Sequence, residues 1–345
     1  MTYSQVLRIA GRDVGIDKPC FIIAEAGVAH FGSLDIARSL VDVAAEAGAD
    51  AVKFQVFKTE RLVSSAAPDW IKRLRPKELP FSAFEEIKQY AEKVGILFLA
   101  TAHEEYSADF LAELGMPAFK IGSGEVSNIP FIRHLASKGK PLIISTGLHD
   151  DASIRSILAT CAASGCSEVA LLHCVTAYPT PYGEANLQAI PAMRRQYNVP
   201  VGYSDHTIGF EVPLAAVALG ATIVEKHICL DKGIAGSQDC KVACDREDLR
   251  AFVAQARHIE AALGTGEKLV AESAKRSMEW ARKSLVAKRR LTSGHRLTID
   301  DVVVKRPGTG IRPDEMDRAI GKVLVSSLEP DEVIKWEHLE TDETA

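Results

Sequence analysis

Short apolar runs alternate with longer amphipathic stretches along residues 19–265 of the chain. Each run has four or five residues, and the stretches between the runs repeat apolar positions with the period of a helix. Strands that are buried on both faces of a parallel sheet have this continuous apolar character. We interpret the runs as eight strands: Phe21–Ala24, Ala51–Phe54, Leu97–Thr101, Ala118–Ile121, Leu142–Ser145, Val169–His173, Val201–Ser204 and Thr222–Glu225.

The stretches between the strands read as helices, and Leu34–Ala47 is a good example. Its apolar residues recur every three or four positions, Ser33 is suited to cap its N-terminus, and Gly48 is suited to end it. Eight strand–helix units predict a parallel sheet with helical crossovers. Closure of that sheet into a (β/α)₈ TIM barrel fits the span, because such a barrel needs roughly 250 residues. A doubly wound open sheet is the alternative.

The pattern changes after Gly264. Residues 267–283 are polar and charged, and short β-like runs separated by Gly and Pro turns follow them. We predict a barrel domain over residues 1–266, a linker over 267–283 and a small domain over 284–345. A domain of about 60 residues buries little apolar surface, so we expect it to dock on a partner.

Composition and charge limit the classes of function. The chain has 345 residues, of which 47% are hydrophobic and 25% charged, as in ordinary globular proteins. A formal net charge of -5 argues against a broad nucleic-acid surface, and the apolar runs are far shorter than the roughly 20 residues of a membrane span. The seven cysteines are odd in number and form no CxxC pair. We therefore expect a cytoplasmic protein with reduced, buried cysteines and no membrane contact.

Polar residues gather where the predicted strands end. The carboxyl ends of barrel strands form the catalytic face of a (β/α)₈ enzyme, so this clustering predicts an enzyme. The residues at these positions are Glu25, Lys53, Gln55, Thr101, His103, Lys120, Ser123, Glu125, Ser145, Thr146, His173, Ser204, Asp205, His206, Glu225, Lys226 and His227.

Two lysines of this set, Lys53 and Lys120, follow apolar strand residues. In a site for an anionic substrate they would neutralise phosphate and carboxylate, with hydroxyl groups nearby as hydrogen-bond donors. One of them could instead form a Schiff base with a keto substrate. A buried ion pair is the third interpretation of either lysine.

Two histidines, His206 and His227, end consecutive strands. Neutral imidazoles on neighbouring strands can share a divalent metal, with Glu25 or Asp205 completing or orienting the ligands. A histidine of the core is the alternative. We expect surface or packing positions for six others, which are His103, His134, His149, His258, His295 and His338.

Several motifs resemble the sialic acid synthase family. The opening segment Phe21–Phe57 is similar to the start of that family, and residues 283–311 resemble its C-terminal antifreeze-like (SAF) domain. The motifs occur in family order along nearly the whole chain. The shorter ones are FKIGSGE (Phe119–Glu125), STG (Ser145–Gly147), HCVTAYPTP (His173–Pro181), GYSDHTIG (Gly202–Gly209) and VEKH (Val224–His227).

The resemblance implies a (β/α)₈ barrel followed by a SAF domain, in a domain-swapped homodimer. It implies a transferase that condenses phosphoenolpyruvate with N-acetylmannosamine or a related 2-acetamido or diacetamido hexose. The products are a nine-carbon 2-keto acid, N-acetylneuraminate or a related nonulosonate, and phosphate. The implied cofactor is a divalent metal, commonly Mn²⁺, with Mg²⁺ or Co²⁺ as alternatives.

The resemblance also implies roles for individual residues. His206 and His227 match metal ligands, and Asp239 matches an aspartate that contacts the sugar. The phosphoenolpyruvate-binding set is matched by Lys53, Thr101, Lys120, Ser123, Ser145 and Ser204. Sugar-binding or catalytic positions are matched by Glu25, Glu125, Tyr178 and Arg306. Among these, Glu25 is expected to position or deprotonate a water, and Glu125 to hold the sugar.

Three departures from the family pattern lie on the sugar side. Ala29 and Thr176 stand where relatives have asparagine, and the loop Gly236–Asp239 lacks the family's Gly–Pro–Asp. The acceptor sugar therefore stays open among N-acetylmannosamine and the precursors of legionaminate and pseudaminate. Two other functions stay open as well, a Schiff-base aldolase or lyase and a sugar-binding protein without catalysis.

Overall fold

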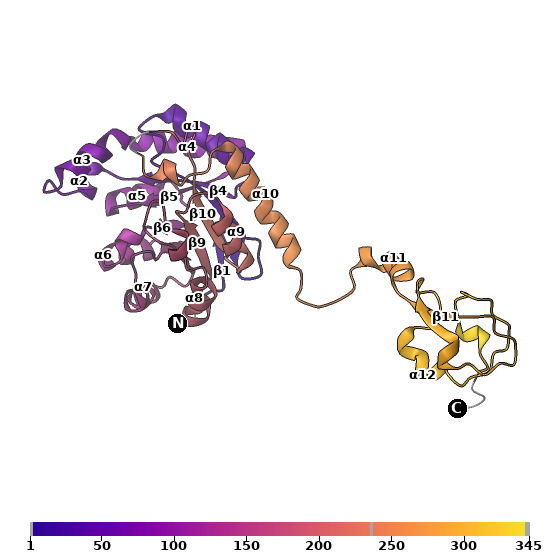
Figure 1. Ribbon diagram of the computed structural model, residues 1–345. Coiled ribbons are helices and arrows are strands. Elements are labelled where there is room, and N and C mark those ends of the chain that lie inside the picture. Colours follow the sequence, from indigo (N-terminus) through magenta and orange to yellow (C-terminus); the bar gives the residue numbers. More distant parts are fainter. Residues whose placement is uncertain (1–2, 235–236, 342–345) are drawn as a thin grey trace. The chain divides into compact units, whose positions relative to one another are not determined.

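The computed structural model describes residues 3–234 and 237–341, so Gly236 of the sugar-side loop lies outside the described residues. The chain divides into two compact units between Gly264 and Thr265. Figure 1 shows the helices and strands of both units.

The first unit is a closed parallel barrel, as the alternation of apolar runs predicts. Its strands follow each other around the barrel in chain order, and the last one pairs with the first. The alternative of an open sheet is therefore wrong. The strands are β3 (Phe21–Gly27), β4 (Ala51–Val56), β5 (Leu97–Ala102), β6 (Phe119–Ile121), β7 (Leu142–Ser145), β8 (Val169–His173), β9 (Val201–Asp205) and β10 (Ile223–His227).

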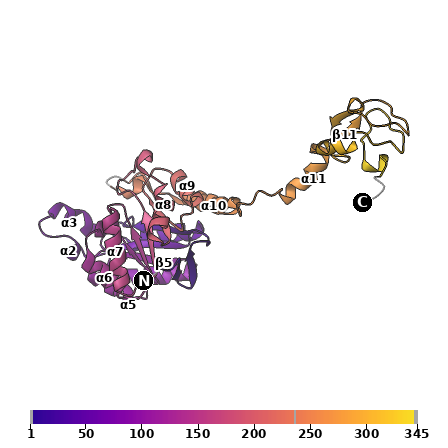
Figure 2. The ribbon, with the colours of Figure 1, turned by 90° about the horizontal axis from the view of Figure 1, so that it is seen from below.

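Helices surround the strands (Figure 1, Figure 2). They bury their apolar stripe against the barrel: in the first helix, Ser33 accepts a hydrogen bond from the Ile36 N–H as the N-cap, and Leu40 and Val41 are buried. The helices are α1 (Leu34–Glu46), α2 (Thr59–Leu62), α3 (Pro68–Leu74), α4 (Phe81–Val94), α5 (Glu105–Glu113), α6 (Ile129–Ala136), α7 (Asp151–Ala163), α8 (Ala189–Tyr197), α9 (Glu211–Ala218) and α10 (Arg246–Leu263). No helix within residues 3–234 and 237–341 is both long and apolar enough to cross a membrane.

One glycine lets the two histidine-bearing strands approach closely. A Cβ atom on Gly202 of β9 would lie 2.3 Å from the carbonyl oxygen of Ile223 on β10. These strands pair in parallel, with Tyr203 opposite Val224. A side chain at position 202 would force them apart, and with them the residues at their carboxyl ends.

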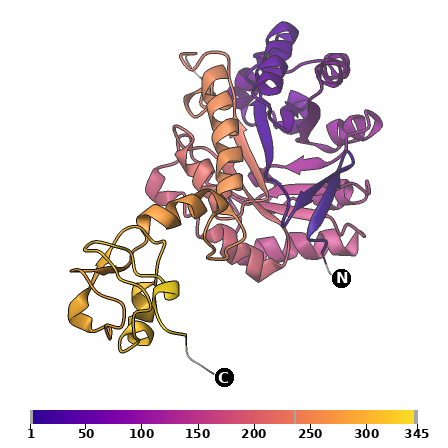
Figure 3. The same cartoon turned by 90° about the vertical axis from the view of Figure 1, so that its right-hand side faces the viewer.

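A hairpin that the sequence pattern did not predict precedes the barrel. Its strands are β1 (Val6–Ile9) and β2 (Arg12–Gly15), and Figure 3 shows it in indigo beside one end of the barrel strands. The Arg8 N–H donates to Glu168, and Arg12 pairs with Asp50 at 2.7 Å. Glu168 and Asp50 directly precede β8 and β4, so the hairpin covers the amino-terminal end of the barrel.

The second unit has a core of its own. It contains α11 (Glu272–Ala281), β11 (Ser284–Ala287), β12 (Val302–Lys305) and α12 (Met316–Ala319), and β11 pairs with β12 in antiparallel fashion. The Gly308 N–H donates to the Glu279 carbonyl at 2.6 Å, which ties the connector helix to this unit. Its buried apolar residues include Leu285, Leu297, Leu324 and Ile334.

Candidate active site

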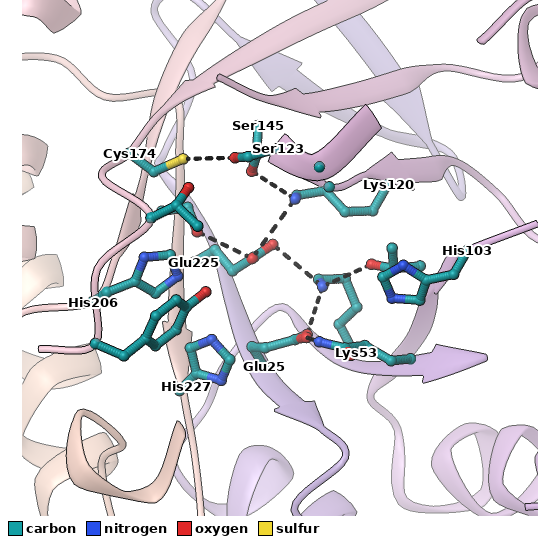
Figure 4. Close-up of a pocket in the computed structure, with 17 residues that line it drawn as sticks. Glu25, Lys53, His103, Lys120, Ser123, Ser145, Cys174, His206, Glu225 and His227 are labelled. Atoms are coloured by element: carbon teal, nitrogen blue, oxygen red, sulfur yellow. Dashed lines mark hydrogen bonds and ion pairs between the residues drawn. The ribbon is translucent and has the colours of Figure 1, made fainter. Parts of the chain in front are cut away.

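A cavity of about 190 Å³ lies at the carboxyl ends of the barrel strands (Figure 4). Every barrel strand, or the loop directly after it, contributes to its wall. The lining residues are Glu25, Lys53, Gln55, Thr101, His103, Lys120, Gly122, Ser123, Gly124, Ser145, Cys174, Thr176, Tyr178, Ser204, His206, Glu225 and His227. Ten of the thirteen residues to which the resemblance assigned a role are among them.

The two predicted lysines lie on the cavity wall and interact with two carboxylates. The Nζ of Lys53 is 2.6 Å from Oε2 of Glu25 and donates to the Thr101 hydroxyl at 3.0 Å. The Nζ of Lys120 donates to the Ser145 hydroxyl at 2.7 Å. Figure 4 shows Glu225 between the two ammonium groups, 3.6 Å from that of Lys53 and 3.8 Å from that of Lys120.

Burial and mutual attraction shift the pKa values of these groups in different directions. Burial raises the pKa of Glu25 above its usual range, although Lys53 opposes this. For Glu225 burial acts in the same direction, but Lys120 and Lys53 together outweigh it and lower the pKa. Burial also lowers the pKa of Lys120, whereas the two glutamates raise that of Lys53. Glu25 is therefore the carboxylate closest to exchanging a proton near neutral pH.

The two predicted metal ligands lie side by side with a tyrosine. The ring centroids of His206 and His227 are 5.5 Å apart, and that of Tyr178 is 4.1 Å from His206. The Nδ1 of His206 is 2.7 Å from the Val175 carbonyl, which can only accept, so Nδ1 carries the proton and Nε2 keeps its lone pair. Burial lowers the pKa of both histidines, that of His206 to about 4. Both imidazoles are thus neutral, as metal ligands must be.

The donor set around these histidines is small. No three His, Cys, Asp or Glu side chains form a metal-binding group within residues 3–234 and 237–341. Two neutral imidazoles would fit a divalent transition metal that takes its other ligands from outside these two side chains. That arrangement leaves open coordination positions, which a catalytic metal needs.

A wholly buried ion pair lies next to the histidines in the chain. The Nζ of Lys226 is 2.5 Å from Oδ2 of Asp205 and donates to the Thr207 carbonyl at 2.7 Å. The Thr207 hydroxyl donates to Oδ1 of Asp205 at 2.9 Å. This pair therefore ties the end of β9 to the end of β10, immediately before His206 and His227.

Three consecutive strand ends meet at Gly147. Its N–H donates to the Ser123 hydroxyl at 3.0 Å, and that hydroxyl is 3.3 Å from the sulfur of Cys174. A Cβ atom on Gly147 would lie 2.4 Å from the Thr176 hydroxyl and 2.9 Å from the Cys174 sulfur. Glycine is needed here because any side chain would push these polar groups out of the cavity wall.

Three predicted site residues do not line the cavity. Glu125 is half-buried in the turn after β6, where it accepts a hydrogen bond from Asn128 at 2.7 Å. Asp239 lies near enough that its charge raises the pKa of Tyr178, though burial contributes more. Arg306 belongs to the second unit and lies over the ring of Trp280 at 5.7 Å. Their roles stay predictions.

The cavity wall includes further polar residues to which the resemblance assigned no role. His103 lines the cavity, so a position on the outer surface is wrong, whereas its edge-on contact with Phe57 agrees with the packing alternative. Glu225, Gln55 and Cys174 also line it, and Gln55 donates to Glu25 at 3.2 Å. The position of His103, Gln55 and Glu225 at strand ends was the signal in the sequence. Cys174 carried no such signal, because buried cysteines are common, and all seven here are free and buried.

Two family models match this chain. A model of the NeuB family matches residues 40–268, more than half of the chain, and a model of the SAF domain matches residues 282–340. The chain belongs to the NeuB family. The resemblance noted from the motifs is thereby confirmed, as are the (β/α)₈ barrel and the SAF domain.

Relatives of this NeuB-family chain are aligned over nearly their whole length. The N,N'-diacetyllegionaminic acid synthase of Legionella pneumophila is 38% identical, over 94% of this chain and 96% of that protein. The N-acetylneuraminate-9-phosphate synthase of Homo sapiens is 35% identical, over 95% of this chain and 94% of that protein. The crystal structure of a sialic acid synthetase from Leptospira borgpetersenii has a TM-score of 0.75 and 33% identity, over 81% of this chain and 96% of that one. This chain is accordingly an enzyme, a transferase of the sialic acid synthase type that forms a carbon–carbon bond.

Proposed function

We propose that the enzyme condenses phosphoenolpyruvate with a 2-acetamido or diacetamido hexose, giving a nine-carbon 2-keto acid and phosphate. The observation that carries this proposal is the pair of buried ammonium groups, Lys53 and Lys120, beside two neutral imidazoles in one cavity. Such a pair suits a substrate with a phosphate and a carboxylate on adjacent atoms. The names of the relatives support the class of product.

The residues of the wall have separate tasks in this reaction. Lys53 and Lys120 bind the phosphate and carboxylate, and the hydroxyls of Ser145 and Ser204 add hydrogen bonds to them. The enol methylene attacks the aldehyde carbon of the open-chain sugar. Water then adds to the carbon that bears the phosphate, and phosphate leaves as its C–O bond breaks. Glu25 positions this water and accepts its proton, a task that its raised pKa suits.

A divalent metal, Mn²⁺ in the first place, is part of the proposal, and His206 and His227 would hold it. Their neutral state and the closeness of both rings to each other and to Tyr178 support this assignment. When bound, the metal supplies Lewis acidity toward the aldehyde oxygen. Among the described residues no third His, Cys, Asp or Glu side chain joins these two histidines, so the metal would need further ligands from outside the protein.

The sugar side of the site completes the proposal. Glu125 holds the sugar, and Asp239 adds a second carboxylate contact. Arg306 is exposed and makes no ion pair with the described residues, which leaves its guanidinium available to a ligand. We assign it to the site of the partner subunit in a domain-swapped homodimer.

Phosphate release tests the function directly. The enzyme is incubated with phosphoenolpyruvate, Mn²⁺ and a panel of 2-acetamido and 2,4-diacetamido hexoses, and release above background with at least one sugar is expected. The Lys120→Ala variant should release none. Lys138→Ala is the matched control, because Lys138 pairs with Asp109 outside the cavity and its loss should leave the rate unchanged. No release with any sugar would refute the proposal.

One observation favours a second function. Burial lowers the pKa of Lys120, which is the property of a lysine that attacks a carbonyl. A Schiff-base aldolase would be trapped as a covalent adduct when borohydride is added together with a keto substrate. Mass spectrometry of the treated protein therefore separates the two mechanisms, and an adduct at Lys120 would favour the aldolase.

A further inference from the structure

His103 is a part of the cavity wall to which the proposed reaction assigns no task. It lies two residues after Thr101 of β5, and Figure 4 shows it beside Lys53. Its backbone N–H donates to the Val56 carbonyl at 3.3 Å, and its ring meets that of Phe57 at 6.3 Å in an edge-on contact. These contacts hold the imidazole in place on the wall.

One nitrogen of this ring lacks a hydrogen bond. The Nε2 of His103 is buried and finds no hydrogen-bond partner among the described residues. A buried polar atom without a partner costs free energy, and native proteins keep few of them. Because His103 lines the cavity, a ligand that enters there can supply the missing contact.

The charges around His103 explain why an imidazole suits this position. Burial first, and the ammonium groups of Lys53 and Lys120 in the same direction, lower the pKa of His103 to about 4. The ring is therefore neutral in the empty site and is not repelled by its two cationic neighbours. It still carries one N–H, which can donate to an anion.

We propose that His103 is a further ligand of the anionic substrate, donating an imidazole N–H to a phosphate or carboxylate oxygen of phosphoenolpyruvate. This inference rests on the proposed function, since phosphoenolpyruvate is the substrate of that reaction. His103 would then be a third group that binds this substrate beside Lys53 and Lys120. It follows β5, which lies between β4 of Lys53 and β6 of Lys120 in the barrel.

Kinetics of two substitutions test the inference. His103→Phe keeps the ring and its contact with Phe57 but removes the donor, and His103→Gln retains an N–H. We expect His103→Phe to raise KM for phosphoenolpyruvate roughly 10- to 100-fold, the usual worth of a hydrogen bond to a charged group, with kcat and the sugar KM little changed. His103→Gln should recover part of this loss. His258→Phe, at an exposed position on α10, is the matched control and should behave as the wild type.

Each outcome of these assays decides one question. If the wild type turns over and His103→Phe has an unchanged KM for phosphoenolpyruvate, the assignment of His103 is overturned. If kcat and both KM values change together with the melting temperature, the residue is structural and the assignment is equally overturned. If the wild type releases no phosphate with any sugar, the proposed function fails, and direct calorimetric binding of phosphoenolpyruvate then decides about His103. Weaker binding by His103→Phe supports the assignment, and equal binding overturns it.

Nuclear magnetic resonance provides a readout that a structural role would not move. The imidazole signal of His103 is the one that is present in the wild type and absent from His103→Phe. Its pH titration is recorded with inorganic phosphate and with pyruvate as separate probes. An anion beside the ring favours its charged form, so the pKa of His103 should rise with the probe that it contacts. A rise with phosphate identifies the phosphate end, and a rise with pyruvate identifies the carboxylate end. No rise with either probe, or with phosphoenolpyruvate itself, refutes the contact.

Discussion

The ion pair between Asp205 and Lys226 offers the sharpest test of how the site is held together. Both side chains have no measurable exposure to solvent. Lys226→Met preserves most of the side-chain volume but removes the ammonium group, which leaves the Asp205 carboxylate buried without its cationic partner, although Thr207 still donates to it. An uncompensated charge of this kind costs about 3–5 kcal/mol.

The expected loss can be measured as a shift of the melting temperature. For a barrel of this size, 1 kcal/mol corresponds to about 2–4 °C, so Lys226→Met should lower the melting temperature by roughly 6–20 °C. Adding Asp205→Asn removes the stranded charge and should recover about 1–3 kcal/mol relative to the sum of the single variants. Circular dichroism at 222 nm follows the barrel helices and serves as the assay.

An exposed pair on the same barrel gives the matched control. Lys88 pairs with Glu92 one turn along α4, and Lys88→Met should cost no more than about 0.5 kcal/mol. A melting temperature of Lys226→Met within about 2 °C of the wild type would refute the argument from burial. Equal losses from Lys88→Met and Lys226→Met would refute it as well.

Three further predictions concern the metal, the dimer and the second unit. EDTA should abolish phosphate release, and Mn²⁺ should restore it. His206→Ala should bind Mn²⁺ more weakly by calorimetry but have the melting temperature of the wild type. Full turnover in chelated buffer would contradict the metal assignment. Arg306→Ala and Lys120→Ala subunits should each be nearly inactive alone. After random exchange into mixed dimers they should regain up to about a quarter of the wild-type activity. No recovery despite proven exchange would mean that Arg306 acts in the site of its own subunit or in no site. Burial raises the pKa of Asp301, but hydrogen bonds from His295, Thr298 and Arg289 outweigh burial and hold this pKa well below its usual range. The ionised Asp301 therefore stabilises the second unit above about pH 4, and this stabilisation is lost as the pH falls further. Hydrogen exchange of peptides from the second unit should show this loss, and Asp301→Asn should abolish the dependence while Asp300→Asn, at an exposed position, should not.

The eight strands of the barrel could be predicted because each is buried on both faces. A parallel strand that is buried on both faces is apolar at most positions, so runs such as Leu142–Ser145 are visible without any knowledge of tertiary contacts. The hairpin of β1 and β2 lacked this signal. Its strands have four residues each, and exposed Arg and Asp side chains interrupt the apolar ones.

The site residues on the barrel strands could be predicted from the sequence, and those on the loops less well. Lys53 and Lys120 lie within β4 and β6, whereas His206 directly follows β9 and His227 ends β10. The barrel geometry alone brings these four side chains to one cavity. Glu125 follows β6 by four residues, and the direction of its side chain depends on a turn that periodicity does not describe. The electrostatic environment is likewise a property of the closed barrel, since the neutral state of a histidine depends on burial and on lysines from other strands.

The hairpin at the amino-terminal end of the barrel bears on how substrates would reach the site. Leu7, Ile9 and Val14 are part of the same apolar core as the barrel strands, so that end is filled by side chains. The route to Lys53, whose side chain is 2% exposed, therefore runs through the opposite face. For the proposed reaction the two substrates share one entrance, so the substrate bound at the lysines has to enter before the sugar. The phosphate cleaved from it can then dissociate only after the longer product has left. Steady-state kinetics should then be sequential and ordered, with phosphate released last.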